Sequence, residues 1–170
     1  MIRVVTLDEF DKKQMEKLCR TLYAAFGVGA EHSGDVKVPP STPEPFEPQR
    51  LLQDLPKVLS FADDKVLFLT SRKLKERALA TGTAPTQGWA EHGRTRAVLS
   101  THGFKDFESA HKQIARHALH QIGHLWDLHH CLDPRCAMYP SWTPSFATGE
   151  VLFCPFCREK SEQKIRLAAS

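Results

Sequence analysis

The sequence predicts an α/β (α+β) domain in which a few short strands accompany one long helix, followed by an irregular C-terminal part. Three observations support this fold class. Short apolar runs suited to buried strands alternate with segments of helical periodicity. Residues 104–128 contain no proline and one glycine, and their apolar residues recur every three or four positions. The chain beyond them is rich in proline and turn-forming residues and carries four of the five cysteines.

The first half of the chain combines one strand with two helices. Residues 2–6 form the first predicted strand, and Asp8 is expected to cap the helix that follows, which Gly27 ends. Residues 38–48 hold five of the eleven prolines, which exclude regular helix and interior strand. We expect an extended connector there, and then a short helix at about residues 49–60.

The second half contains the strongest signals. Residues 65–70, KVLFLT, are a continuous apolar run typical of a buried strand, and residues 96–101 are a second candidate. Residues 80–94 between them are rich in glycine, which indicates a long loop or an irregular hairpin. Residues 104–128 are the strongest predicted helix, and a last helix at about residues 158–167 closes the chain.

Composition and charge limit the class of protein to which the chain can belong. With 170 residues, 41% of them hydrophobic and 25% charged, the chain suits one globular domain, residues 1–170. We expect the sheet and helices within residues 1–125 and a C-terminal subdomain in residues 126–170. The net charge of +3 is spread along the chain and does not favour a nucleic-acid partner. No apolar run is long enough for a signal peptide or a membrane span, so we expect a cytoplasmic protein without a membrane partner. We also expect a monomer.

Six of the nine histidines lie between residues 111 and 130. On a helix, His120 and His124 fall on one face a turn apart, which allows two imidazoles to bind one zinc ion, and His117 shares that face. Catalytic zinc usually has three protein ligands, so a third must come from beyond the helix. His130 can supply it if the helix ends before that residue. Asp127 stands at the turning point and tolerates a left-handed backbone better than most residues.

For each single histidine, another interpretation stays open: a helix can carry histidines that cap its end or face solvent. His129, next to the third predicted ligand, is expected to point elsewhere, either exposed or as a neighbour of the ligands.

The cysteines predict a second metal site. Two close pairs separated by a loop are typical of a tetrahedral zinc bound by four cysteines, and four ligands leave no open position, so this zinc would be structural. Such an ion would hold the irregular C-terminal part together. Two disulfides or four free thiols remain the alternatives. Cys19 stands alone inside the first helix and is expected to be a core residue without a further role. The two pairs are Cys131 with Cys136, and Cys154 with Cys157.

Taken together, these residues resemble the archaemetzincins, a branch of the metzincin zinc metalloproteases. The pattern of that family is H-E-x-x-H-x-x-G-x-x-H-C-x4-C-x-M, followed by C-x-x-C. The resemblance implies a zincin/metzincin-like fold, with a small mixed sheet and a long active-site helix. The matching positions here are His120, Gln121, His124, Asp127, His130, Cys131, Cys136, Met138, Cys154 and Cys157.

The resemblance also implies roles for single residues. His120, His124 and His130 would bind the catalytic zinc, and Met138 would form the Met-turn, a methionine packed beneath the metal site. The strand at residues 96–101 would line the cleft and pair with an extended peptide substrate.

Two positions depart from the family pattern. Asp127 replaces a glycine, which the turn can accommodate, and Gln121 replaces the glutamate that serves as general base. A glutamine can orient water but has no titratable proton near neutral pH. Loss of a general acid/base typically costs roughly 10²–10⁴ in rate. His117 is the one residue considered as a substitute proton carrier.

The sequence therefore predicts a zinc-dependent metallopeptidase with two zinc ions, acting on peptides or unfolded proteins, whose hydrolysis is weak or absent because of Gln121. The first alternative is a non-catalytic zinc-containing module that binds peptides or proteins. A weaker alternative is a zinc-ribbon-like adaptor for nucleic acid or a protein partner, built around the cysteines.

Overall fold

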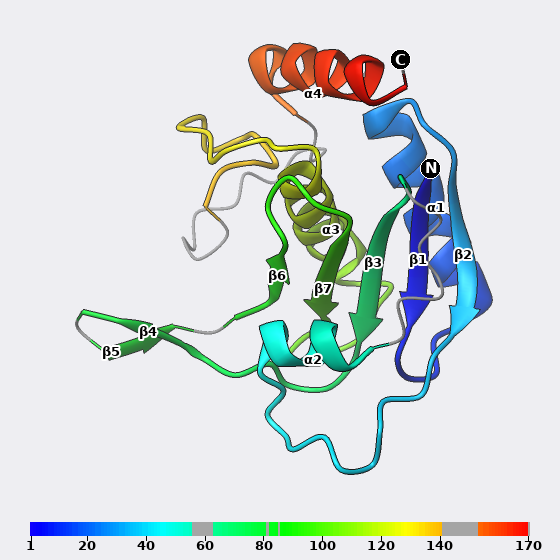
Figure 1. Cartoon of the computed structure of the whole chain (residues 1–170), viewed down its shortest axis with the longest axis vertical. Helices are drawn as coiled ribbons and strands as arrows, with labels where there is room; N and C mark the ends of the chain where they lie inside the picture. Colours follow the sequence, from blue (N-terminus) through cyan, green and yellow to red (C-terminus); the bar gives the residue numbers. More distant parts are fainter. Residues whose placement is uncertain (56–62, 81, 85, 141–152, 170) are drawn as a thin grey trace.

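The computed structural model describes residues 1–55, 63–80, 82–84, 86–140 and 153–169. Strands and helices alternate from β1 to β3, five strands then follow one another from β3 to β7, and two helices end the chain; the strands form a main sheet and a separate hairpin (Figure 1). In chain order the elements are β1 Ile2–Thr6, α1 Lys12–Phe26, β2 Ala30–Asp35, α2 Pro48–Asp54, β3 Lys65–Thr70, β4 Arg77–Leu79, β5 Gly82–Ala84, β6 Gly88–Ala90, β7 Arg96–Ser100, α3 His111–Leu125 and α4 Pro155–Ala168.

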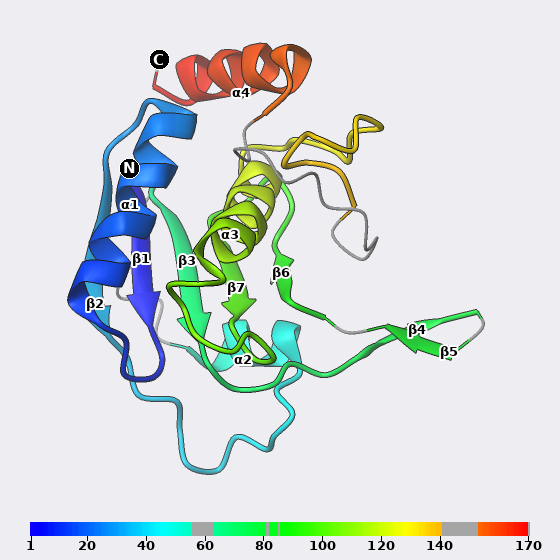
Figure 2. The ribbon, with the colours of Figure 1, turned by 180° about the vertical axis from the view of Figure 1, so that it is seen from behind.

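The main sheet has five strands in the order β2-β1-β3-β7-β6. Strands β2, β1, β3 and β7 are parallel, whereas β6 runs antiparallel to β7 and forms one edge. Helices α1 and α3 cover one face of the sheet and α2 covers the other, as the two opposite views in Figures 1 and 2 show. This mixed sheet with a long helix confirms the predicted fold class.

The burial of β3 explains its continuous apolar run. Leu67 and Leu69 pack toward α1 and α3, whereas Val66 and Phe68 pack toward α2. Successive side chains of a strand point to opposite faces, so a strand covered on both sides has no polar alternation. The strands predicted at residues 2–6, 65–70 and 96–101 are confirmed.

The N-terminal helix begins later than predicted. Asp11, not Asp8, is its N-cap, and the Asp11 carboxylate accepts a hydrogen bond from the backbone N–H of Gln14. The Asp8 carboxylate instead accepts hydrogen bonds from the Thr70 hydroxyl at 2.6 Å and the Ser71 backbone N–H at 2.7 Å. Asp8 therefore links the end of β1 to the end of β3, a long-range contact that local sequence does not reveal.

Three other boundaries differ from the predictions. The long helix begins at His111, because residues 104–110 form turns in which the Asp106 carboxylate accepts a hydrogen bond from the Ser109 N–H. The second helix covers Pro48–Asp54, and residues 56–60 of its predicted range lie outside the described residues. The last helix starts at Pro155, earlier than expected, because Cys154 caps it.

The predicted loop at residues 80–94 contains two short strands. Strand β5 pairs with β4 in a hairpin that projects from the body of the protein (Figure 2). Strand β6 pairs with β7 and occupies the sheet edge. The expectation that residues 96–101 line the cleft edge is therefore wrong: β7 lies inside the sheet, and β6 takes the edge position. Strand β2 was not predicted, since Ala30–Asp35 lacks an apolar run.

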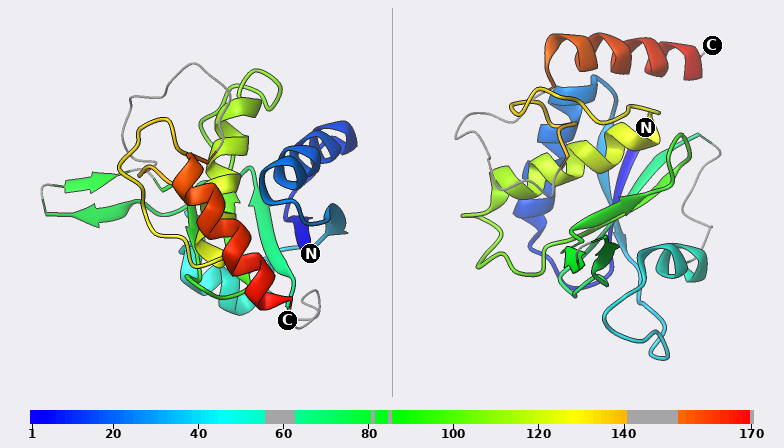
Figure 3. Two further views of the ribbon diagram at one scale, coloured as in Figure 1. Left: turned by 90° about the horizontal axis from the view of Figure 1, so that it is seen from above. Right: turned by 90° about the vertical axis from the view of Figure 1, so that its left-hand side faces the viewer.

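Helix α4 lies across the end of α1, away from the sheet (Figure 3). Cys19 lies on the buried face of α1, and burial raises the pKa of its thiol to about 11, which suits a packed and unreactive residue. Among the described residues, no helix combines the length and apolar character needed to cross a membrane.

Candidate metal centres

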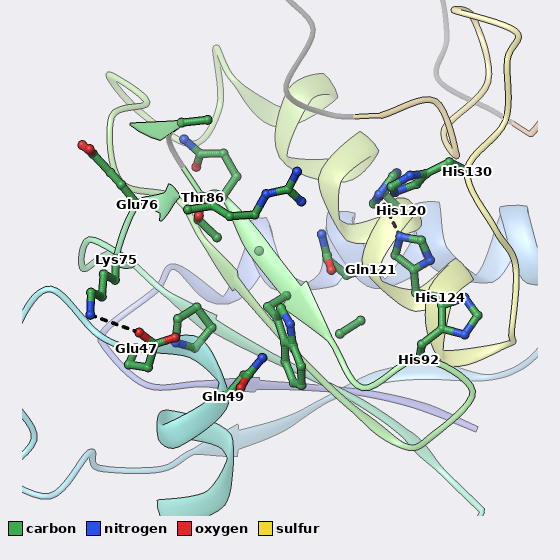
Figure 4. A pocket seen from close by; sticks show the side chains of 17 residues that line it. Glu47, Gln49, Lys75, Glu76, Thr86, His92, His120, Gln121, His124 and His130 are labelled. Carbon is green, nitrogen blue, oxygen red and sulfur yellow. Dashed lines mark hydrogen bonds and ion pairs between the residues drawn. The ribbon is translucent and has the colours of Figure 1, made fainter. Parts of the chain in front are cut away.

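A cleft of about 400 Å³ lies between α3 and the edge strand β6 (Figure 4). His120, Gln121 and His124 of α3 line one wall, together with His130. Strand β6 lines the opposite wall, and the segment from Lys75 to Arg77 and the start of α2 extend the cleft away from the histidines.

Three histidines converge at the α3 end of this cleft. The Nε2 atoms of His120 and His124 lie 3.0 Å apart. The ring of His130 is 5.2 Å from that of His120 and 5.0 Å from that of His124, centroid to centroid. Each ring offers one nitrogen, and the three nitrogens lie within 4.8 Å of one another. The structure therefore brings together all three histidines that the sequence predicted as ligands.

Backbone carbonyls orient two of these rings. The Nδ1–H of His120 donates to the Ala137 oxygen at 2.9 Å, and the Nδ1–H of His124 donates to the Leu128 oxygen at 2.8 Å. Because Nδ1 carries the hydrogen in both rings, the lone pairs of both Nε2 atoms point into the cluster. A hydrogen bond of this kind on the second ring nitrogen is usual for metal-ligating histidines.

The rings are also in the protonation state that metals bind. Burial lowers the pKa of His120 to about 3 and the pKa of His124 to about 4. Burial, followed by the nearby Arg77, lowers the pKa of His130 as well. Neutral imidazoles with converging lone pairs form a donor set that fits a zinc ion.

The turn that delivers His130 follows from the end of α3. The backbone N–H of Leu128 donates to the Gly123 oxygen and that of Asp127 donates to the His124 oxygen, both at 3.0 Å, which is the Schellman pattern of a helix C-terminus. Asp127 occupies the left-handed position of this pattern, with φ 60°. The left-handed turn predicted at Asp127 is confirmed.

Met138 packs against α3. Its side chain is fully buried, and a Cβ placed on Gly123 would lie only 2.4 Å from the Met138 sulfur. The Met138 oxygen accepts a hydrogen bond from the Cys131 N–H, and the preceding residue, Ala137, orients His120. Met138 thus lies behind the histidine cluster, at the place expected for a Met-turn, and it explains why position 123 is glycine.

Gln121 lies between the histidines and the edge strand. Its side chain is buried but lines the cleft, and it makes no hydrogen bond to another described residue (Figure 4). A Cβ on Gly88 of β6 would lie 2.9 Å from the Gln121 Nε2 atom. The absence of a side chain at Gly88 therefore makes room for the Gln121 amide.

The other two histidines considered from the sequence lie outside the cluster. His117 does not line the cleft; its ring packs 6.2 Å from that of Phe104, and burial lowers its pKa to about 4. The structure thus gives no support to His117 as a substitute proton carrier. His129 is exposed, as expected, and lies beside His92.

The four clustered cysteines also converge. Their sulfurs lie within 4.8 Å of one another, and those of Cys131 and Cys154 are 3.8 Å apart. None of the five cysteines forms a disulfide in the structure, so the alternative of two disulfides finds no support there. Backbone N–H groups donate to these sulfurs, for example those of Met138 and Cys154 to the Cys136 sulfur, as suits thiolates around a metal ion.

The residues of the opposite wall of the cleft were not predicted from the sequence. Gly88, Arg77 and His92 precede the histidine helix by many residues, and no spacing links them to it. The glycines of residues 80–94 were the only signal, and they indicated irregular chain rather than a position against Gln121.

A search with family models finds no match, and no curated protein matches the sequence. Solved structures do match. An archaemetzincin from Methanopyrus kandleri has a TM-score of 0.76 at 21% identity, covering 97% of this chain and 94% of that one. An archaemetzincin from Archaeoglobus fulgidus has a TM-score of 0.69 at 21% identity, with coverages of 94% and 99%. A zinc-dependent peptidase from Methanocorpusculum labreanum has a TM-score of 0.68 at 19% identity, with coverages of 95% and 100%. Over nearly its whole length, the chain thus has the fold of the archaemetzincins.

Proposed function

We propose that the protein is a cytoplasmic zinc metallopeptidase in architecture that binds peptides or unfolded proteins and hydrolyses them weakly or not at all. In this proposal His120, His124 and His130 hold the catalytic zinc, and the four clustered cysteines hold a structural one. The observation that carries it is the convergence of three oriented imidazoles at a cleft with Gln121 beside them.

The solved structures with the same fold support the proposed zinc ion and the proposed class of substrate. Two are archaemetzincins and one is a zinc-dependent peptidase. When bound, zinc polarises a carbonyl group and lowers the pKa of water to about 7. The edge strand β6 offers main-chain groups along the cleft, to which an extended peptide can add as a further strand.

Gln121 decides how far the chemistry proceeds. Its amide can hold a water molecule through hydrogen bonds, but it cannot accept the proton of that water and pass it to the leaving amine. Peptide hydrolysis needs that transfer, because an unprotonated amine anion is a very poor leaving group. The missing proton transfer corresponds to roughly 3–5 kcal/mol of barrier.

The test compares the zinc-loaded wild type with Gln121→Glu on an unstructured fluorogenic peptide. We expect the substitution to raise kcat/KM by roughly 10²–10⁴. Gln49→Glu is the matched control, since Gln49 lines the far end of the same cleft and the chemical change is identical. Equal rates for the wild type and Gln121→Glu, both at ordinary protease level, would refute the role given to position 121.

A second candidate function, a non-catalytic peptide-binding module, is favoured by the same glutamine. Binding of a labelled peptide to the wild type, measured by fluorescence anisotropy without turnover, separates it from an impaired enzyme. If Gln121→Glu also remains inactive while the peptide binds, the binding module is the better description.

A further inference from the structure

A third group of metal-ligating side chains lies outside both clusters already described. His92 comes from the loop between β6 and β7, and Asp127 and His129 come from the turn after α3. Each offers one ligand atom, and the three atoms lie within 4.8 Å of one another. The His92 Nδ1 atom is 3.2 Å from the Asp127 Oδ1 atom, and the His92 and His129 rings are 4.7 Å apart.

The contacts of His92 leave one of its ring nitrogens available to a metal ion. Its Nε2 atom lies 3.2 Å from the Leu128 oxygen, which can only accept, so Nε2 carries a hydrogen. Its Nδ1 atom faces the Asp127 carboxylate, which also only accepts. A neutral imidazole has one N–H, so with that hydrogen on Nε2 the lone pair of Nδ1 faces the carboxylate. A metal ion between them would bind both groups.

We propose that His92, Asp127 and His129 form a third metal site, which takes a divalent transition-metal ion such as zinc or nickel. His129 supplies the third donor, and three protein donors are a usual number for a transition-metal site. Two imidazoles and one carboxylate suit zinc and nickel, whereas calcium and magnesium prefer oxygen ligands throughout. The hydrogen bond from His92 Nε2 to a carbonyl is the same support that the ligands of the histidine cluster have.

The third site is joined to the histidine cluster through one carbonyl group. The Leu128 oxygen accepts hydrogen bonds from both His92 and His124. The neighbouring Gly93 N–H also donates to the His124 oxygen at 2.8 Å. A metal ion here would tie the β6–β7 loop, which forms part of the cleft wall, to the turn that carries His130.

A substitution of Lys164 is expected to strengthen metal binding at this site, whereas substitutions of the ligands should weaken it. Its ammonium group lies 2.6 Å from the Asp127 Oδ2 atom, which leaves Oδ1 for a metal ion. Because a positive charge beside the ligand repels a divalent ion, Lys164→Gln should tighten metal binding by about 3- to 10-fold. A purely structural role for this ion pair predicts no such gain.

The experiment titrates zinc, and separately nickel, into purified full-length protein already saturated at its tight sites, by isothermal titration calorimetry at pH 7.5. We expect one additional equivalent in the wild type. The variants His129→Ala and His92→Ala should bind that equivalent at least about tenfold more weakly. His102→Ala, which removes an exposed histidine elsewhere, should match the wild type. Anomalous scattering from zinc-soaked crystals would place the ion.

Two results would overturn the proposal. The first is a wild type that binds no additional equivalent. The second is an additional equivalent that His129→Ala retains with unchanged affinity. The difference in metal binding between the wild type and His129→Ala does not depend on how many ions the histidine and cysteine clusters hold. Failure of the third site and failure of the proposed function are therefore seen separately.

Discussion

The substitution Gly123→Ala tests whether Met138 and the active-site helix pack as the structure shows. Helix propensity alone predicts that the substitution stabilises the protein, since alanine in a helix interior is favoured over glycine by about 1 kcal/mol. The tertiary structure predicts that it destabilises the protein. The new Cβ would lie 2.4 Å from the Met138 Sδ atom and 3.2 Å from its Cε atom, with a Leu128 methyl group at 3.5 Å.

The magnitude follows from these distances. Nonpolar atoms pack at about 3.5–4.0 Å, so the sulfur must move by more than about 1 Å within a fully buried site. Overpacking of this kind costs roughly 1–3 kcal/mol, which offsets or exceeds the gain in helix propensity. The net loss of stability should reach about 2 kcal/mol at most. For a domain of this size a loss of about 2 kcal/mol lowers Tm by about 4–8 °C.

Thermal and urea unfolding of the zinc-loaded protein measure this loss, and a double-mutant cycle with Met138→Ala shows its cause. Removing the methionine side chain makes room for the new methyl group. The double variant should therefore be more stable than the sum of the single effects by at least about 0.5–1 kcal/mol. A Gly123→Ala protein as stable as the wild type, with additive effects in the cycle, would refute this description of the packing.

Three further predictions concern the second metal cluster, a long-range link and the buried histidines. Cys154→Ser should reduce the bound zinc by one equivalent and weaken zinc binding at the histidine cluster, because His130 and Cys131 are adjacent. Asp8→Ala should lower the free energy of unfolding by about 2 kcal/mol, since the hydroxyl and N–H groups at the end of β3 lose their acceptor. For metal-free protein, stability should fall as the pH drops below about 6.5 toward 4. The folded-state pKa of His117, near 4, lies below its ordinary value of 6.5, so the unfolded chain takes up the proton first. His117→Gln should remove about 1 kcal/mol of the loss between pH 6 and pH 5.

Each of these predictions has its own control. Cys19→Ala should keep the zinc content of the wild type, and an unchanged content in Cys154→Ser would count against the four-cysteine zinc site. Asp11→Ala, which removes the observed helix cap, should lower the free energy of unfolding by only about 1 kcal/mol. A larger loss in Asp11→Ala than in Asp8→Ala would contradict the roles given to the two carboxylates. An identical pH dependence for His117→Gln and the wild type in urea unfolding would show that His117 is not buried as described.

The chemistry-bearing residues were predictable because their signals are local. A helix repeats its face every three or four residues, so the positions of His120 and His124 follow from spacing alone. The turn at Asp127 follows from the few residues that tolerate a left-handed backbone, and the cysteine pairs follow from the reach of a short loop around one metal ion. The strands with continuous apolar runs were equally predictable, since burial on both faces leaves a local pattern.

The opposite wall of the cleft was not predictable, because long-range packing decides it. Strand β6 takes the sheet edge in place of β7, and Gly88 meets Gln121 only after the sheet has assembled. Asp8 has the character of a helix cap but binds the end of β3, since that partner lies far away in the chain.

The sequence by itself determined two sets of possible metal ligands, the three histidines and the four cysteines, and that position 121 beside the histidines carries an amide. Both depend on residue identity and on spacing along one helix or one loop. Only the tertiary structure decided which backbone faces those side chains across the cleft, and that His92 meets Asp127 and His129. The reason is physical: contacts between distant segments depend on how the sheet and helices pack, and the spacing of residues along the chain carries no record of that packing.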